Sequence, residues 1–178
     1  PDFKTRQEFR PATKTSEIKK ADGTKATVPG YKGAQSNEND YSDNFLTYTY
    51  DFNRDGWDDI IVYGFPGTAV FWYENPQGAA GHWKAHKTID VLDNESPAFG
   101  DLNGDGKPEI VCNSNGYLGY AAPDWNHPDQ PWTWHAISPK GAWQRYSHGI
   151  GFGDVNGDQR ADMLEANGWW EQPASLAG

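Results

Sequence analysis

A nine-residue acidic segment recurs three times in this chain, at an interval of about fifty residues. The copies occupy residues 51–59, 101–109 and 154–162, and they begin 50 and then 53 residues apart. Each copy is followed directly by a short apolar run. A fixed period of this length is typical of repeat architectures, in which each repeat forms one unit that packs against the next. This repeat constrains the fold more strongly than any other feature of the sequence.

Each repeat contains short strand-forming segments and no helical periodicity. Aromatic segments follow the apolar runs at residues 70–74 and 168–171 and, more weakly, at 119–122, and a Trp-x-x-His pattern occupies 83–86 and 132–135. Twenty glycines and twelve prolines are spread between these segments and favour turns. Four short strands in about fifty residues are typical of a β-propeller blade. The prediction is an all-β fold in which residues 45–178 form about two and a half to three four-stranded blades.

A propeller of this size is incomplete. Propellers close with roughly four to eight blades, and an open stack would expose the apolar faces of its end blades. We therefore expect the remaining blades to come from the same longer polypeptide, or alternatively from other chains.

Residues 1–44 differ in composition from the rest. They hold eight basic and seven acidic side chains, whereas residues 45–178 hold seven basic and eighteen acidic ones. We interpret the first segment as a polar leader that can form a hairpin around Asp22-Gly23 or supply a closing strand.

The overall charge excludes several classes of partner. The chain has 178 residues and a formal net charge of −10, which argues against nucleic acid and anionic membranes as partners. No apolar run approaches the roughly 18 residues of a membrane span. Cys112 is the single cysteine, so we expect a buried small hydrophobe and no disulfide within the chain.

The nonapeptides carry oxygen-bearing side chains at positions 1, 3, 5 and 9, and the position 7 carbonyl can add one more. Ca²⁺ takes six to eight oxygen ligands, and alternate residues of a tight loop can point inward together. The absence of His and Cys from the three nonapeptides argues against Zn²⁺ or Cu²⁺ as the bound ion. We predict up to three structural Ca²⁺ ions, one per loop. The candidate ligands are Asp51, Asn53, Asp55, Trp57 and Asp59; Asp101, Asn103, Asp105, Lys107 and Glu109; and Asp154, Asn156, Asp158, Arg160 and Asp162.

Position 6 of the loop needs a positive φ, which Gly56 and Gly106 supply readily. Gln159 stands there in the third copy, where a positive φ carries a conformational penalty of about 1 kcal/mol. Two alternatives stay open for this loop, weaker metal binding or a different turn. An EF-hand is excluded, because position 12 lacks the required bidentate Glu in the first two copies and strand formers follow each loop.

The stretch Phe-Gly-Asp-Leu-Asn-Gly-Asp-Gly at 99–106 and its counterpart at 152–158 resemble the FG-GAP/VCBS repeat of integrin-α-like β-propellers. The resemblance covers residues 45–178, and the aromatic strands look like those of large secreted bacterial FG-GAP proteins of the planctomycete type. It implies part of a seven-bladed propeller, a Ca²⁺ in each loop between the innermost and second strands, and an extracytoplasmic location. It implies no reaction.

Residues six to eight positions before each nonapeptide would enter at the opposite rim of such a propeller. These are Asp43, Asn44 and Phe45; Asp93, Asn94 and Glu95; and Tyr146, Ser147 and His148; loops after the second strands would add Phe65, Asn115 and Asn167. The mixture of Glu95, Arg145, Tyr146 and His148 could bind sugars or uronic acids and could perform acid–base chemistry.

Three functions follow as hypotheses. The first is a non-catalytic, Ca²⁺-stabilised propeller that binds carbohydrate or protein outside the cytoplasm. The alternative is an enzyme, a polysaccharide lyase or sugar dehydratase with its active site on this rim. The third is a purely structural or adhesive module. No Ser-His-Asp pattern and no phosphate-binding loop is readable in the sequence.

Overall fold

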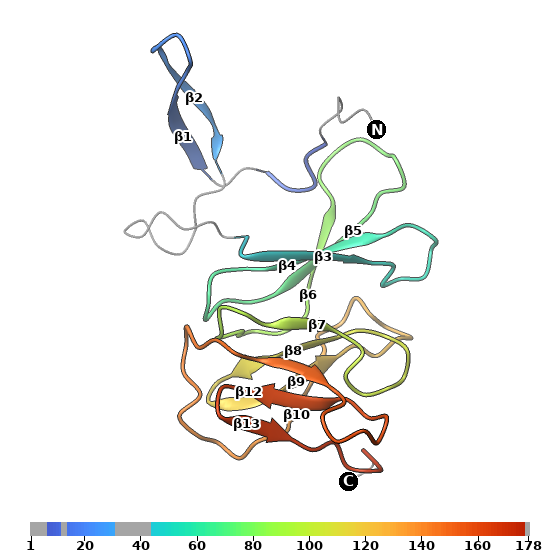
Figure 1. Ribbon diagram of the computed structural model, residues 1–178. Coiled ribbons are helices and arrows are strands. Elements are labelled where there is room, and N and C mark those ends of the chain that lie inside the picture. Colours follow the sequence, from blue (N-terminus) through green and yellow to red (C-terminus); the bar gives the residue numbers. More distant parts are fainter. Residues whose placement is uncertain (1–6, 12–13, 31–43, 177–178) are drawn as a thin grey trace. The chain divides into compact units, whose positions relative to one another are not determined.

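The structure is a computed structural model that describes residues 7–11, 14–30 and 44–176. Within these ranges all regular structure is β, as predicted, and the strands form antiparallel sheets (Figure 1). No helix in the described part of the chain is long and apolar enough to cross a membrane. The chain divides into two compact units, Pro1–Phe65 with Phe71–His86, and Pro66–Val70 with Lys87–Gly178.

The first unit contains a two-stranded hairpin of β1 (Lys14–Lys19) and β2 (Lys25–Gly30). Gly23 has a φ of 86°, and Oδ1 of Asp22 accepts hydrogen bonds from the backbone and hydroxyl of Thr24 at 2.9 and 2.6 Å. The Asp-Gly pair therefore closes the turn between the two strands.

The first unit also contains a four-stranded sheet of β3 (Leu46–Tyr50), β4 (Asp59–Tyr63), β5 (Phe71–Glu74) and β6 (Lys84–Lys87), in that order. Ile61, Tyr63 and Trp72 are fully or almost fully buried. His86 stacks on Trp72 with ring centroids 4.2 Å apart, and its Nε2 lies 2.8 Å from Oε2 of Glu74. The Trp-x-x-His pattern thus places a histidine in the core of this sheet.

The second unit contains two sheets. The first has the order β10-β9-β8-β7, from β7 (Ala98–Gly100), β8 (Glu109–Ser114), β9 (Tyr117–Ala122) and β10 (Thr133–Ala136). The other is β11 (Gly151–Gly153), β12 (Asp162–Glu165) and β13 (Gly168–Trp170). Every residue of β8 is buried, which explains its continuous apolar run. Cys112 lies in this strand, and burial raises the pKa of its thiol.

The two sheets of the second unit share one hydrophobic core. Leu102, Val111, Leu118, Tyr120 and Met163 form its buried centre, and Phe152 and Trp170 pack against it. A Cβ on Gly100 would lie only 2.7 Å from Cζ of Phe152, so the absence of a side chain at Gly100 lets the Phe152 ring approach. Tyr120, Phe152 and Trp170 are thus packing residues of this core.

The repeat pattern maps directly onto the topology. Each nonapeptide links the first and second strands of its sheet, between β3 and β4, β7 and β8, and β11 and β12. The apolar runs form β4, β8 and β12. The segments predicted for the rim precede the first strands, so each first strand has an acidic loop at one end and a rim segment at the other.

Candidate metal centre and ligand surface

The first aspartate of each nonapeptide closes the loop. Oδ1 of Asp51 accepts the N–H of position 5 at 3.0 Å, and its Oδ2 accepts that of position 6 at 2.9 Å. Asp101 and Asp154 make the same pair of hydrogen bonds at 3.1 and 2.9 Å. The three loops therefore share one backbone conformation, and the acidic first residue is part of its cause.

Positions 3 and 5 each close a smaller turn. In the second loop, Oδ1 of Asn103 accepts the N–H of Asp105 at 2.8 Å, and Oδ1 of Asp105 accepts the N–H of Lys107 at 2.9 Å. The first and third loops repeat both bonds. Such Asx turns are the usual local use of Asn and Asp side chains.

The backbone is left-handed at two positions of every loop. At position 6, Gly56, Gly106 and Gln159 have φ angles of 88°, 80° and 70°, so the predicted strain at Gln159 is present. The φ angles at position 4 are also positive. Arg54 has a φ of 60°, and the glycines at position 4 of the other two loops have φ angles about as large as those at position 6. The positive φ at position 4 was not predicted from the sequence. Only the second loop has glycine at both positions.

Position 9 carries the buried acids Asp59, Glu109 and Asp162, each with no exposed surface. Asp59 accepts the N–H groups of Phe52 and Asn75 at 3.0 and 2.8 Å. Asp162 makes the equivalent bonds to Val155 and Gln172 at 3.0 and 2.9 Å. These aspartates tie the loop to the end of the third strand, a structural role that the sequence analysis did not anticipate.

Glu109 is one methylene longer and turns into its own loop instead. Oε2 accepts the N–H groups of Leu102 and Asn103 at 2.8 and 3.2 Å, and Oε1 accepts Nδ2 of Asn103 at 2.9 Å. The pKa of Glu109 is raised to about 7, chiefly by burial; the N–H donors of Leu102 and Asn103 lower it, and the charges of Asp105 and Asp101 raise it. Burial likewise raises the pKa of Asp59 to about 6.

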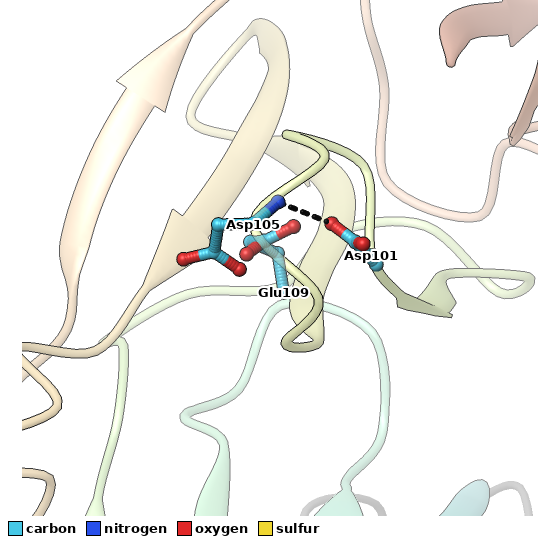
Figure 2. Close-up of side chains that lie close together, drawn as sticks. All are labelled: Asp101, Asp105 and Glu109. Carbon is cyan, nitrogen blue, oxygen red and sulfur yellow. Dashed lines mark hydrogen bonds between the residues drawn. The ribbon is translucent and has the colours of Figure 1, made fainter. Parts of the chain in front are cut away.

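The second loop brings three carboxylates together. Oxygen atoms of Asp101, Asp105 and Glu109 all lie within 4.8 Å of one another, and Figure 2 shows Glu109 between the other two. Oxygens that share one Ca²⁺ at about 2.3–2.6 Å are at most about 5 Å apart, so this donor set fits the ion. The charges of Asp105 and Asp101 contribute to the raised pKa of Glu109, after the larger effect of burial. Within the described ranges this is the group of acidic side chains that meets that spacing.

The first and third loops differ from the second at position 5. Oδ2 of Asp55 accepts Nε2 of Gln77 at 2.8 Å and Nδ2 of Asn53 at 3.0 Å. In the third loop, Asp158 accepts Nδ2 of Asn156 at 3.1 Å and pairs with the Arg160 guanidinium. The bond from Gln77 lowers the pKa of Asp55, and the backbone N–H of Arg160 lowers that of Asp158. These carboxylates already have partners that a cation would have to displace.

The four principal rim candidates lie together in the second unit. Nε2 of His148 lies 2.8 Å from Oε2 of Glu95, and Nε of Arg145 lies 3.5 Å from Oδ1 of Asp93. The backbone joins the same segments, because Tyr146 donates to the Asp93 carbonyl at 3.0 Å and Glu95 donates to that of Ser147 at 3.1 Å. We call these five residues, with Ser147, the rim cluster.

These contacts join equivalent positions of successive repeats. Glu95 and His148 each stand six residues before a nonapeptide, and Asp93 and Tyr146 each stand eight residues before one. Two segments with the same place in the repeat therefore run side by side.

Beneath the rim cluster lie two buried amides. Asn94 and Asn113 are 1% and 0% exposed, and Oδ1 of Asn94 accepts the N–H of Asn113 at 3.0 Å. Nδ2 of Asn113 donates to the carbonyl of Gln144 at 3.0 Å, which links β8 to the segment before β11. Asn94 is one of the predicted rim residues, whereas Asn113 was not predicted, because its position inside an apolar strand gives no sign of this role.

Of the other rim candidates, Asn115 contacts this cluster, because it donates its N–H to Oδ2 of Asp93 at 2.8 Å. Asn44, Phe45 and Phe65 belong to the first unit, where the two phenylalanine rings pack edge to face at 5.7 Å. Asn167 donates its N–H to Oε2 of Glu165 in the β12–β13 turn. Asp43 lies outside the described residues.

Comparison with curated proteins and with solved structures found no match. A family model does match part of the chain, and the matched residues extend from the start of the first acidic loop to Cys112 in β8. They include two of the three loops and support the resemblance drawn from the sequence. Residues 51–112 match the model of the FG-GAP-like repeat family.

Proposed function

We propose that the sheets are blades of a Ca²⁺-stabilised β-propeller that binds carbohydrate or protein outside the cytoplasm. The observation that carries the proposal is the contact between equivalent positions, Glu95 with His148 and Asp93 with Tyr146. Blades related by rotation about a common axis bring the same position of neighbouring repeats together near that axis. The shared core of the two sheets and the FG-GAP-like match support the same architecture.

In this proposal the acidic loops hold up to three Ca²⁺ ions through positions 1, 3, 5, 7 and 9, and the second loop, whose three carboxylates lie within 4.8 Å of one another, is the best suited. Bound Ca²⁺ would compensate carboxylate charge that otherwise opposes closure of the loop. The chain itself supplies the loop shape, through the Asp101 hydrogen bonds, and the buried anchor, through Glu109. We infer a structural role for the ions, because the loops and the rim segments lie at opposite ends of the first strands.

The proposed ligand surface is the rim cluster. Its side chains mix positive, negative and aromatic groups, and Tyr146 is 47% exposed. The remaining blades would come from the same longer polypeptide or from other chains. An extracytoplasmic setting suits such loops, because extracellular Ca²⁺ modules bind the ion with dissociation constants of about 10⁻⁴–10⁻³ M.

Calorimetry tests the metal part of the proposal. Addition of Ca²⁺ to the EGTA-treated chain should raise the Tm by several degrees, and Mg²⁺ at the same concentration should raise it less. An unchanged Tm would contradict the metal assignment. Glycan-array binding that is lost in the Glu95→Ala, His148→Ala double variant, with the Ca²⁺ response retained, would locate the ligand surface at the rim.

A second candidate function is supported by the 2.8 Å contact between His148 and Glu95. A carboxylate that orients an imidazole is a common arrangement for a general base, and Tyr146 lies in the same segment. In a lyase, the base would remove the proton next to a sugar carboxylate, and the glycosidic oxygen would depart as a new carbon–carbon double bond forms. Ultraviolet absorbance of the unsaturated product, lost in His148→Ala, would support an enzyme. If no such absorbance develops with any member of a broad panel of polyuronates, the enzyme is rejected and the ligand-binding function is retained.

A further inference from the structure

We propose that Arg145 is a preset anchor for the carboxylate of an acidic sugar, a uronic acid unit, at the rim cluster. The inference rests on the proposed function of this rim as a ligand surface, and it specifies the chemistry of the ligand.

The guanidinium of Arg145 lies directly against the backbone of Gly67. A Cβ at Gly67 would overlap Cζ, Nε and Nη2 of Arg145, so a side chain at this position would displace the guanidinium. Gly67 is itself fixed, because its φ is 88° and its N–H donates to the carbonyl of Leu92 at 2.5 Å. The glycine therefore provides a surface on which the guanidinium rests.

Asp93 holds the guanidinium from another side. Its Oδ1 lies 3.5 Å from Nε of Arg145, its Oδ2 accepts the N–H of Asn115 at 2.8 Å, and its carbonyl accepts the N–H of Tyr146 at 3.0 Å. Only 11% of the Asp93 side chain is exposed, whereas 52% of the Arg145 side chain is. Asp93 is thus a recessed support for an arginine that reaches solvent.

The remaining edge of the guanidinium suits a carboxylate. Arginine has five N–H donors, and Asp93 faces only the one on Nε. The two Nη atoms can present parallel donors, the geometry that carboxylates bind in bidentate fashion. Since the side chain is already held by Gly67 and Asp93, binding loses less conformational entropy than it would at a mobile arginine.

The basic side chains of the rim cluster are more exposed than its acidic ones. The His148 side chain is 69% exposed, whereas that of Glu95, which it contacts, is 26% exposed. The acids of the cluster are therefore the recessed members and the basic side chains face solvent. This pattern stands out in a region, residues 45–178, that holds eighteen acidic and only seven basic residues.

Tyr146 favours a sugar as the source of the carboxylate. It is 47% exposed, its φ is 69°, and its N–H bond to Asp93 fixes the backbone beside Arg145. An exposed aromatic side chain on a fixed backbone, next in sequence to the arginine, can stack on the apolar face of a sugar ring whose carboxylate reaches the guanidinium. An acidic peptide also carries carboxylates, but it has no sugar ring on which the tyrosine could stack.

Isothermal titration calorimetry on the full chain with Ca²⁺ tests the proposal with three probes. These are tetragalacturonate, the same oligosaccharide with its carboxyl groups reduced to alcohols, and tetraglutamate. Tetragalacturonate should bind at least about tenfold more tightly than either of the others, in line with the strength of charge-assisted hydrogen bonds. Arg145→Gln should lower its affinity by about tenfold or more, and Arg145→Lys by less. Lys84→Gln removes one positive charge outside the rim cluster and should leave the affinity unchanged.

Gly67→Ala provides a test in which the arginine is still present. It should reduce tetragalacturonate binding as Arg145→Gln does, because the new methyl group displaces the guanidinium. Gly78→Ala is the matched control, since Gly78 has a φ of 87° and no atom within 4 Å of the added Cβ. It should lower stability to a similar extent without a change in affinity.

Three outcomes would overturn the proposal. Equal binding of the reduced oligosaccharide, with Arg145→Gln unaffected, would remove the carboxylate anchor and leave the rim as a surface for neutral carbohydrate. Tighter binding of tetraglutamate would assign the site to a protein ligand. Failure of all three probes to bind would reject the anchor itself, while the Ca²⁺ response of the Tm separately tests the propeller proposal.

Discussion

Oε2 of Glu109 accepts the backbone N–H of Leu102 at 2.8 Å, although the two residues stand at opposite ends of the second acidic loop. Glu109 is the first residue of β8, and Leu102 belongs to the core shared by the two sheets of the second unit. The contact couples the charge of the loop to the packing of the core, so changes at Glu109 should affect stability as well as metal binding.

Removal of the Glu109 side chain should destabilise the metal-free chain. Glu109→Ala leaves the buried N–H of Leu102 without its acceptor, at a free-energy loss of about 2–4 kcal/mol. Glu109→Gln keeps one acceptor oxygen but places an amide group against Nδ2 of Asn103, so about 1 kcal/mol should be lost. Urea denaturation in EGTA measures both. Both variants should also respond less to Ca²⁺, and a full response in Glu109→Gln would contradict its role as a ligand.

Stability without metal should fall as the pH rises from 5 to 8. The pKa of Glu109 is raised from 4.5 to about 7 and that of Asp59 from 3.8 to about 6, so the folded state holds protons that the unfolded state has released. The stability that these protons provide is present below the unfolded pKa values and is lost through pH 6–7. The loss should be on the order of 3 kcal/mol in sum.

Denaturation in EGTA at several pH values measures this slope, and Glu109→Gln should flatten it near pH 7. In excess Ca²⁺ the slope should decrease or reverse, because metal binding requires deprotonated carboxylates. A metal-free chain that becomes more stable between pH 5 and 8 would contradict the assignment of these two buried acids.

Gln159→Gly should strengthen the third loop. Gln159 has a φ of 70°, a conformation that glycine adopts without the penalty of about 1 kcal/mol. The expected result is a gain of about 0.5–1 kcal/mol in stability and tighter Ca²⁺ binding by this loop. Gln159→Ala is the control, since it shortens the side chain without relief of the backbone. Equal effects of the two substitutions would show that the side chain matters and the backbone does not.

The Cys112 thiol should report on opening of the core. It is fully buried in β8, and burial raises its pKa, so it should react with a disulfide reagent only after local or global unfolding. Ca²⁺ should slow the reaction severalfold if it stabilises the adjoining loop. A reaction as fast as that of a free thiol in native buffer would contradict the burial.

The sequence predicted much of this structure because its main signals are local. The apolar runs after each nonapeptide form β4, β8 and β12, the second strands of their sheets. Each acidic loop therefore directly precedes a second strand. The positive φ at Gln159 was predicted from the demands of the turn at a single residue.

The features that were missed depend on contacts between distant residues. Gly67 supports a guanidinium seventy-eight residues away, and Asn113 reaches the carbonyl of Gln144, thirty-one positions along the chain. Neither residue type carries a pattern that signals such a partner. The left-handed Arg54 was missed for a different reason, since the equivalent glycines of the other loops need no strain at that position.

The pairing of Glu95 with His148 shows that repeats of the same pattern can carry unlike chemistry at one position. Two residues at the same place in successive repeats face each other, yet one is an acid and the other a base. The junction between these repeats is therefore polarised although both of its sides occupy the same place in the unit. Since the acidic turns sit at the far ends of the same strands, the side chains at such a junction can differ while the turns keep their shape.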